Sequence, residues 1–270
     1  MTTFQKIIKY LAIGLAIFIC MTLLTGLVGG VKTFLESLNI IKESDTNYNE
    51  VIDYNTNFSY LDISLNSSNL IIKNGDKFSV DTSDKNIKIF NENNKLKIVD
   101  NNKKIFNTKV KDLIVTIPYN YSFEVVKIET GAGKVNIEGI NTNLLEMELG
   151  AGKTVLNNIV SNKTFVETGA GSVNISNSKL NDLNLELGVG KIDIDAEVTG
   201  KSSIESGIGE LNLSLELPLC EYSFEFEKGI GEIRLNNESI KNNSKIGEGY
   251  NYIKIEGGVG SINVKTLEND

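Results

Sequence analysis

The most regular chemical groups in the chain are glutamates that stand two residues before a Gly-x-Gly triplet. They are Glu129, Glu148, Glu167, Glu186, Glu205, Glu227 and Glu256. If the segments that carry them stack as neighbouring strands, the carboxylates form a ladder. Like charges directly opposite one another in adjacent strands are unfavourable, by somewhat under ~1 kcal/mol per pair at a solvated surface. A glutamate at this position is thus mildly unfavourable, and its recurrence in every copy needs a physical explanation.

Three causes are open for this acidic ladder. In the first, each carboxylate accepts N–H bonds from the Gly-x-Gly bend, and Lys134, Lys153 and Lys191 neutralise it from the next strand. In the second, the ladder is an open face that binds a cation, either a metal ion or a basic peptide. In the third, it is a plain solvated face. The seven glutamates are therefore candidates for a ligand or cation site, without a firm metal site among them.

Most other chemistry is absent from the composition. The chain has no His, which removes imidazole acid–base catalysis and the Ser-His-Asp and Cys-His nucleophiles. Its two cysteines, Cys20 and Cys220, are too few and too far apart for a zinc site or a disulfide framework. A net charge of −8 with a single Arg argues against nucleic-acid binding.

Two further motifs resemble catalytic or nucleotide sites only in part. The segment GAGKT at residues 150–154 ends like a phosphate-binding loop, but Met147 stands where that motif needs its first Gly. Glycosidic catalysis needs two carboxyl groups in different environments, and a uniform ladder provides none. We therefore expect no nucleotide, no cofactor and no enzymatic activity, with a polysaccharide-active β-helix enzyme as a remote alternative.

The glycines themselves define the fold. The triplets that begin at Gly131, Gly150, Gly169, Gly188 and Gly207 are 19 residues apart, and two more follow at Gly229 and Gly258 after longer steps. The expected turn glycines of the regular copies are Gly131, Gly133, Gly150, Gly152, Gly169, Gly171, Gly188, Gly190, Gly207 and Gly209. Glycine allows a sharp corner or a close approach to the neighbouring backbone.

Apolar residues alternate with polar ones on both sides of each triplet, which is typical of strands. One apolar column runs from Ile128 through Leu185 to Ile255, and the residues between the glycines, from Ala132 to Val259, form a second. A 19-residue unit cannot bury its own apolar side, so the copies must stack. The sequence thus predicts an all-β fold, a single-stranded parallel β-solenoid with rungs of about 19 residues, right-handed by the crossover rule. The longer final steps predict rungs that widen toward the C-terminus.

The N-terminal part has a different character. Residues 10–31 contain no charge and are long enough to cross a membrane as a helix, which predicts a transmembrane span; a cleaved signal peptide is the rival. Lys6 and Lys9 place residues 1–9 in the cytoplasm as a short tail. Residues 32–52 are expected to form a juxtamembrane helix and linker.

The predicted extracytoplasmic solenoid covers residues 53–270. Within it, residues 53–127 lack the triplets and form irregular opening rungs, or a separate small sheet, whereas residues 128–265 carry the Gly-x-Gly repeats.

These features together resemble the bacterial "putative adhesin" domain of unknown function found in envelope proteins of Firmicutes. The resemblance is carried by Tyr60–Ser64, by the strand Ile114–Pro118 and by the E-x-G-x-G repeats, and it covers about residues 55–265. It implies a cell-surface or envelope-stress role and supplies no catalytic or ligand residues.

The functional expectation is a non-enzymatic protein of the bacterial cell membrane, single-pass, with its C-terminal domain outside. Such a protein would act as an adhesin-like binding module or an envelope-stress sensor. Its expected partners are the membrane, a cationic peptide, a cell-wall component or a partner membrane protein. The alternative is a regulatory scaffold that acts on partner membrane proteins through its transmembrane helix.

Overall fold

The computed structural model describes residues 57–82, 84–101 and 111–268, and this part of the chain is almost entirely β-structure. Its elements are β1 (Tyr60–Leu65), β2 (Asn69–Gly75), β3 (Ser79–Thr82), β4 (Ile87–Glu92), β5 (Lys95–Asp100), β6 (Asp112–Pro118), β7 (Ser122–Asn181), β8 (Leu183–Thr199), β9 (Lys201–Pro218), the 3-10 turn η1 (Leu219–Glu221), β10 (Tyr222–Leu235), β11 (Glu238–Ser239), β12 (Ser244–Ile246) and β13 (Asn251–Leu267). Among these residues, no helix is long and apolar enough to cross a membrane. The predicted span 10–31 and linker 32–52 lie outside the described part.

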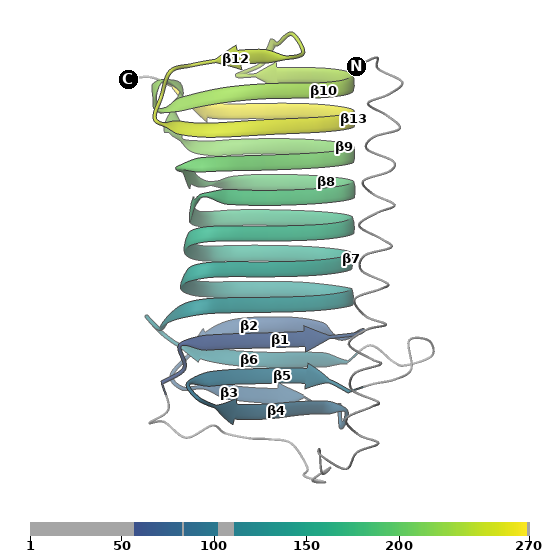
Figure 1. Ribbon diagram of the computed structural model, residues 1–270, viewed down its shortest axis with the longest axis vertical. Coiled ribbons are helices and arrows are strands. Elements are labelled where there is room, and N and C mark those ends of the chain that lie inside the picture. Colours follow the sequence, from purple (N-terminus) through teal and green to yellow (C-terminus); the bar gives the residue numbers. More distant parts are fainter. Residues whose placement is uncertain (1–56, 83, 102–110, 269–270) are drawn as a thin grey trace.

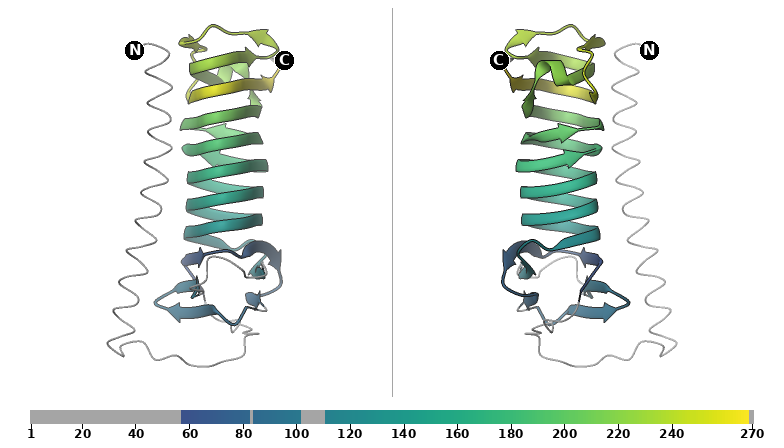
Figure 2. Two further views of the ribbon diagram at one scale, coloured as in Figure 1. Left: turned by 90° about the vertical axis from the view of Figure 1, so that its right-hand side faces the viewer. Right: turned by 90° about the vertical axis from the view of Figure 1, so that its left-hand side faces the viewer.

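The repeats form a column of parallel coils (Figures 1 and 2). Leu185 pairs with Ile204, and Gly190 pairs with Gly209, so one coil takes 19 residues, as the period predicts. The long strand β7 contains the first three repeats, whose triplets begin at Gly131, Gly150 and Gly169. The expectation of an all-β fold of stacked parallel coils is therefore confirmed for the described residues.

The Gly-x-Gly triplets make the corner at which each coil turns from one face of the column to another. Gly171 has φ +133°, and a Cβ there would lie 1.8 Å from the carbonyl oxygen of Gly152 in the coil before it. No side chain can enter such a contact, so each glycine is required by the glycine on the neighbouring coil. The corner is thus built by backbone stacked on backbone.

The two predicted apolar columns behave differently. Val166, Leu185 and Ile204 point inward and are fully buried, as expected of a core column. By contrast, Val189, Ile208 and Ile230, which stand between the glycines, are 51%, 46% and 48% exposed. The tight bend places the middle residue on the outside of the corner, so this second column is an outer ridge and not part of the core.

The final coils are not stacked in the order of the sequence. The sheet runs β8–β9–β13–β10, so the last strand of the chain, β13, lies between β9 and β10. Ile255 pairs with Ile204 on one side and with Phe226 on the other. The longer steps before Gly229 and Gly258 thus reflect an excursion past one coil and a return to fill it. The prediction that the rungs widen is wrong, because β13 pairs residue for residue with both neighbours through the corner.

The N-terminal end has the same kind of arrangement. β1 lies between β5 and the first repeat of β7 and pairs in parallel with both. The first described strand is therefore one coil inward of β5, which comes later in the chain. β2 lies in the same way between β6 and β7. The outermost strands β4 and β3 are antiparallel and close this end (Figure 1). The strands β1 to β6 therefore continue the sheet of the repeats and do not form a separate one.

Aromatic side chains reinforce both ends. Phe58, Phe78, Tyr121 and Phe123 meet edge to face at the N-terminal end, with ring centroids 4.7–6.3 Å apart. At the C-terminal end, the rings of Tyr222, Phe224 and Phe226 stack in sequence inside β10. Such pairs are worth about 0.5–1.5 kcal/mol each beyond the area they bury.

Candidate functional site: an acidic column on one face

The structure places the repeated glutamates in one column on the outer surface. Strand pairing joins Glu167 to Glu186, Glu186 to Glu205 and Glu205 to Glu256. Glu256 in turn pairs with Glu227, while Glu129 and Glu148 precede Glu167 by whole 19-residue coils. In stacking order, the glutamate column is Glu129, Glu148, Glu167, Glu186, Glu205, Glu256 and Glu227. Side chains of a column stand about 4.8 Å apart, the spacing of strands.

Lysines neutralise this glutamate column near its ends. Lys127 Nζ lies 3.0 Å from Glu129 Oε1 and 3.7 Å from Glu148 Oε1. Lys254 Nζ lies 3.0 Å from Glu256 Oε1, and this carboxylate is buried. Each lysine stands two residues before a glutamate on the same strand, and period-two alternation therefore puts both on the same face.

The three lysines predicted to neutralise the glutamate column form no ion pair with it among the described residues. Lys191 pairs instead with Asp193 and Glu210 on the far side of the corner. Lys134 and Lys153 make no ion pair with the glutamate column in the part of the chain that the structure describes. The corner lies between these lysines and the column and turns them onto the adjacent face. At the first corner the N–H of Ala132 donates to the backbone carbonyl oxygen of Asn66 and not to a glutamate of the column.

The middle of the glutamate column has no cationic partner among the described residues. Within the described ranges, Glu167, Glu186 and Glu205 form no ion pair with Lys or Arg. Burial raises the pKa of Glu167, and the charges of Glu186 and Glu148 raise it further. We call Glu167, Glu186 and Glu205 the unpaired segment.

A hydrogen bond links the carboxyl groups of Glu205 and Glu256, where the column passes from β9 to β13. Burial, followed by the charge of Glu256 and a hydrogen bond with it, raises the pKa of Glu205 to about 7. Burial also pushes the pKa of Glu256 upward, but hydrogen bonds with Lys254, Glu227 and Glu205 outweigh it and lower that pKa. Glu205 is therefore only partly ionised near neutral pH, while Glu256 stays ionised beside Lys254.

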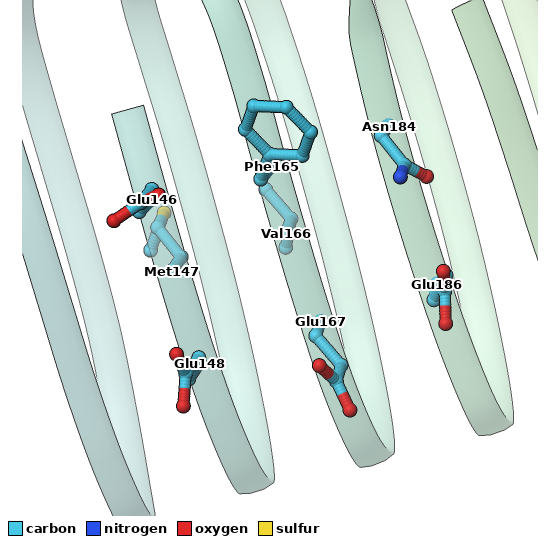
Figure 3. A pocket seen from close by; sticks show the side chains of 8 residues that line it. All are labelled: Glu146, Met147, Glu148, Phe165, Val166, Glu167, Asn184 and Glu186. Atoms are coloured by element: carbon cyan, nitrogen blue, oxygen red, sulfur yellow. The ribbon is translucent and has the colours of Figure 1, made fainter. Parts of the chain in front are cut away.

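A shallow groove runs beside the glutamate column (Figure 3). It is lined by Glu146, Met147, Glu148, Phe165, Val166, Glu167, Asn184 and Glu186. Phe165 is 43% exposed on this acidic surface. The side-chain oxygen of Asn184 is buried and has no hydrogen-bond partner in the structure. The polar lining therefore offers mainly acceptors, which suits a ligand rich in hydrogen-bond donors.

The structure also shows where the residues of two other candidate motifs lie. No group of three or more Asp, Glu or Cys side chains in the described residues is arranged to hold a metal ion. Residues 150–154, which resemble a phosphate-binding loop, lie inside β7, and strand follows them where such a loop needs a helix.

Four residues of the site were not identified from the sequence. Lys127 and Lys254 could have been found from the recurring Lys-Ile-Glu spacing, which places both charges on one face. Phe165 and Asn184 occupy the position four residues before the first glycine, where neighbouring copies carry Glu146 and Lys127. This position varies along the repeat, so periodicity alone gave no reason to select it.

Comparison with known proteins identifies the family. The family model described as "Toastrack DUF4097" matches residues 37–249, and the chain belongs to this family. The resemblance stated from the repeats is thereby confirmed. None of the curated proteins compared with the chain matches it.

The comparison with solved structures finds two similar chains. A "putative cell adhesion protein" from Clostridium sporogenes is 17% identical over 82% of this chain and 98% of its own, with a TM-score of 0.39. A "putative adhesin" from Bacteroides fragilis is 15% identical over 82% of this chain and 95% of its own, with a TM-score of 0.38.

Proposed function

We propose that the chain is a non-enzymatic, adhesin-like binding module of the bacterial cell envelope, anchored by a transmembrane helix at residues 10–31. In this proposal, residues 53–270 form a right-handed solenoid outside the membrane. The length and apolar character of the anchor segment and Lys6 and Lys9 before it support this orientation. Residues 1–56 lie outside the described structure, so this part of the proposal rests on the sequence.

The observation that carries the proposal is the unpaired segment of the glutamate column. Glu167, Glu186 and Glu205 form no ion pair in the described structure, although lysines neutralise the column on either side. Removing the repulsion would require only a change of residue type in the repeat. Three adjacent carboxylates without a cationic partner on a sheet surface favour a cationic, donor-rich ligand such as a basic peptide.

Binding of a cationic peptide tests this function. We would titrate an oligolysine peptide into the full chain in a nonionic detergent and follow fluorescence anisotropy at several salt concentrations. The triple variant Glu167→Gln, Glu186→Gln and Glu205→Gln should bind at least tenfold more weakly, and the loss should shrink as salt screens the wild type.

A matched control removes the same charge elsewhere. Glu138, Glu216 and Glu238 are exposed carboxylates away from the column, and their triple Gln variant should bind within twofold of the wild type. Equal losses in both triple variants would show that only net charge matters and would contradict a defined binding face. A triple variant of the column that loses thermal stability instead would assign the glutamates a structural role.

The second candidate is the scaffold that acts through its membrane helix. It predicts that the action on partner membrane proteins survives the triple Glu→Gln substitution. That action should be lost when Tyr10–Val31 is exchanged for an unrelated span.

A further inference from the structure

The N-terminal half of the face that carries the glutamate column has an unusual order of side chains. It is formed by β4, β5, β1 and the three repeats of β7, which lie side by side in that order. Phe90 pairs with Lys97, Lys97 with Asp62 and Asp62 with Lys127. The next coils add Glu146 and Phe165 at 19-residue intervals. We call this set of side chains, with the columns on either side of it, the palindromic face.

The central column changes only its charge signs when it is read backwards. Along the stack it reads Phe90, Lys97, Asp62, Lys127, Glu146 and Phe165. Read from either end, the column therefore begins and ends with a phenylalanine, and the four side chains between them alternate in charge. Reversal places a lysine wherever the forward direction has a carboxylate.

The flanking columns follow the same rule. On one side the order is Lys88, Val99, Ser64, Glu129, Glu148 and Glu167. On the other side the order is Glu92, Lys95, Tyr60, Val125, Leu144 and Lys163. Reversing either column sets a lysine against a glutamate at its ends, and nowhere sets two like charges against each other.

We infer that the palindromic face binds a second copy of this chain in antiparallel orientation. The two-fold axis would run parallel to the strands, between β1 and the first repeat of β7. Rotation about it places Lys97 opposite Glu146 of the other copy, and Asp62 opposite Lys127. It also brings together Phe90 and Phe165, and near the axis Tyr60 and Val125. Such an isologous contact closes on itself and gives a dimer.

The exposed aromatic residues support the same axis independently of the charges. Among the phenylalanines that the structure describes, Phe90 and Phe165 are the exposed ones, at 42% and 43%. They stand at the two ends of the same column, at equal distances from the proposed axis. Both rings are therefore covered by one symmetric contact, and neither is covered within the described chain.

The size of the face predicts a weak complex. The face is six strands high, about 29 Å at the usual strand spacing, and three columns wide, about 20 Å at two residues per column. It therefore covers roughly 600 Å² per copy. The total of roughly 1,200 Å² lies at the low end of specific interfaces. The charge pairs are already partly satisfied within each copy, as between Lys97 and Asp62 and between Lys127 and Glu148. Across the interface they define register and orientation more than affinity.

Disulfide trapping tests the register directly. In the full chain in detergent, with Cys20→Ser and Cys220→Ser, one population carries Lys97→Cys and a differently tagged one carries Glu146→Cys. We expect the mixed disulfide to form at least tenfold more than with Lys97→Cys and Asn184→Cys. Asn184 lies in the same column two coils beyond Glu146, about 10 Å out of register. Equal yields for the two pairs would overturn the inference.

Charge reversal provides a second test that does not need cysteine. Lys97→Glu and Glu146→Lys should each raise the dimer dissociation constant at least fivefold in sedimentation measurements. The double variant restores opposite charges across the axis and should return within twofold of the wild type. A double variant that is as weak as either single variant would contradict the inference.

The dimer and the proposed ligand can fail separately. Phe90→Ser should abolish the dimer while oligolysine binding at Glu186 and Glu205 persists, since these residues lie outside the palindromic face. Conversely, Glu186→Gln with Glu205→Gln should weaken oligolysine binding and leave the mixed disulfide yield unchanged.

Discussion

The middle and the ends of the coil column are stabilised in different ways. In the middle, from β7 to β9, coils follow one another in sequence order, corner glycines stack on corner glycines, and the unpaired segment has no cationic partner among the described residues. At each end, the first or the last described strand lies one coil inward, aromatic rings gather, and Lys127 or Lys254 neutralises the glutamate column. The comparison shows that identical coils support each other through backbone contact, whereas the ends depend on particular side chains.

The largest effect should come from the corner backbone of the middle. Gly171→Ala places a Cβ at φ +133° and 1.8 Å from the carbonyl oxygen of Gly152. Strain and overlap together should lower the free energy of unfolding by more than about 4 kcal/mol, measured by urea denaturation. The matched control is Ala170→Val, which copies the exposed corner residue Val189 and should change stability by less than about 0.5 kcal/mol. A corner that tolerates Gly171→Ala would show that the glycines are not required by their neighbours.

The next effect contrasts phenylalanines at the end and in the middle. Phe224 is fully buried between Tyr222 and Phe226, so Phe224→Ala should cost about 3–5 kcal/mol in the free energy of unfolding. Phe165 is 43% exposed, and Phe165→Ala should cost less than about 1 kcal/mol in the monomer. Similar urea midpoints for the two variants would remove the distinction between the regions.

The smallest effect concerns the junction where the unpaired segment meets the C-terminal end. The pKa of Glu205 is raised to about 7, so its protonated form stabilises the fold below the ordinary carboxyl pKa. That contribution is lost as the pH rises from about 4.5 to 7. Glu205→Gln keeps a neutral side chain and should raise stability at pH 7.5 by about 1–2 kcal/mol after discounting for solvent screening, measured by urea denaturation.

The pH dependence provides the control for this last prediction. Glu205→Gln should flatten the decline in stability between pH 5 and 7. Glu129→Gln, at the end that Lys127 neutralises, should leave that decline unchanged. If both variants show the wild-type slope, the proton is not held at Glu205.

Several features of the fold could be predicted from local repetition. The 19-residue period, the inward column of Val166, Leu185 and Ile204, and the glycine corners follow from alternation and spacing alone. The outward position of Val189 and Ile208 could not be read in this way. Apolar character predicts burial, but the backbone of a Gly-x-Gly bend turns its middle residue to the outside.

The stacking order of the last coils was also beyond the sequence analysis. Each Gly-x-Gly copy presents nearly the same edge, so β9 could accept β10 or β13 equally well by local pattern. One sequence signal for placing β10 beside β13 was available. Lys228 stands at a position that alternation turns inward, and the residue at the same position of β13 is Gly257, which leaves room for a long side chain. In the structure the stem of Lys228 passes over Gly257, and its ammonium donates to the carbonyl oxygens of Ile230 and Gly260.

By itself, the sequence determined the coil: its length, its corners, its inward column and a recurring carboxylate on one face, because each depends on residues a few positions apart. The tertiary structure alone decided which coils touch. It set Glu256 rather than Glu227 beside Glu205, and it assembled the palindromic face from strands as distant in sequence as β4 and the third repeat of β7. The physical reason is that equivalent edges differ little in local energy, so contacts between distant segments select the order.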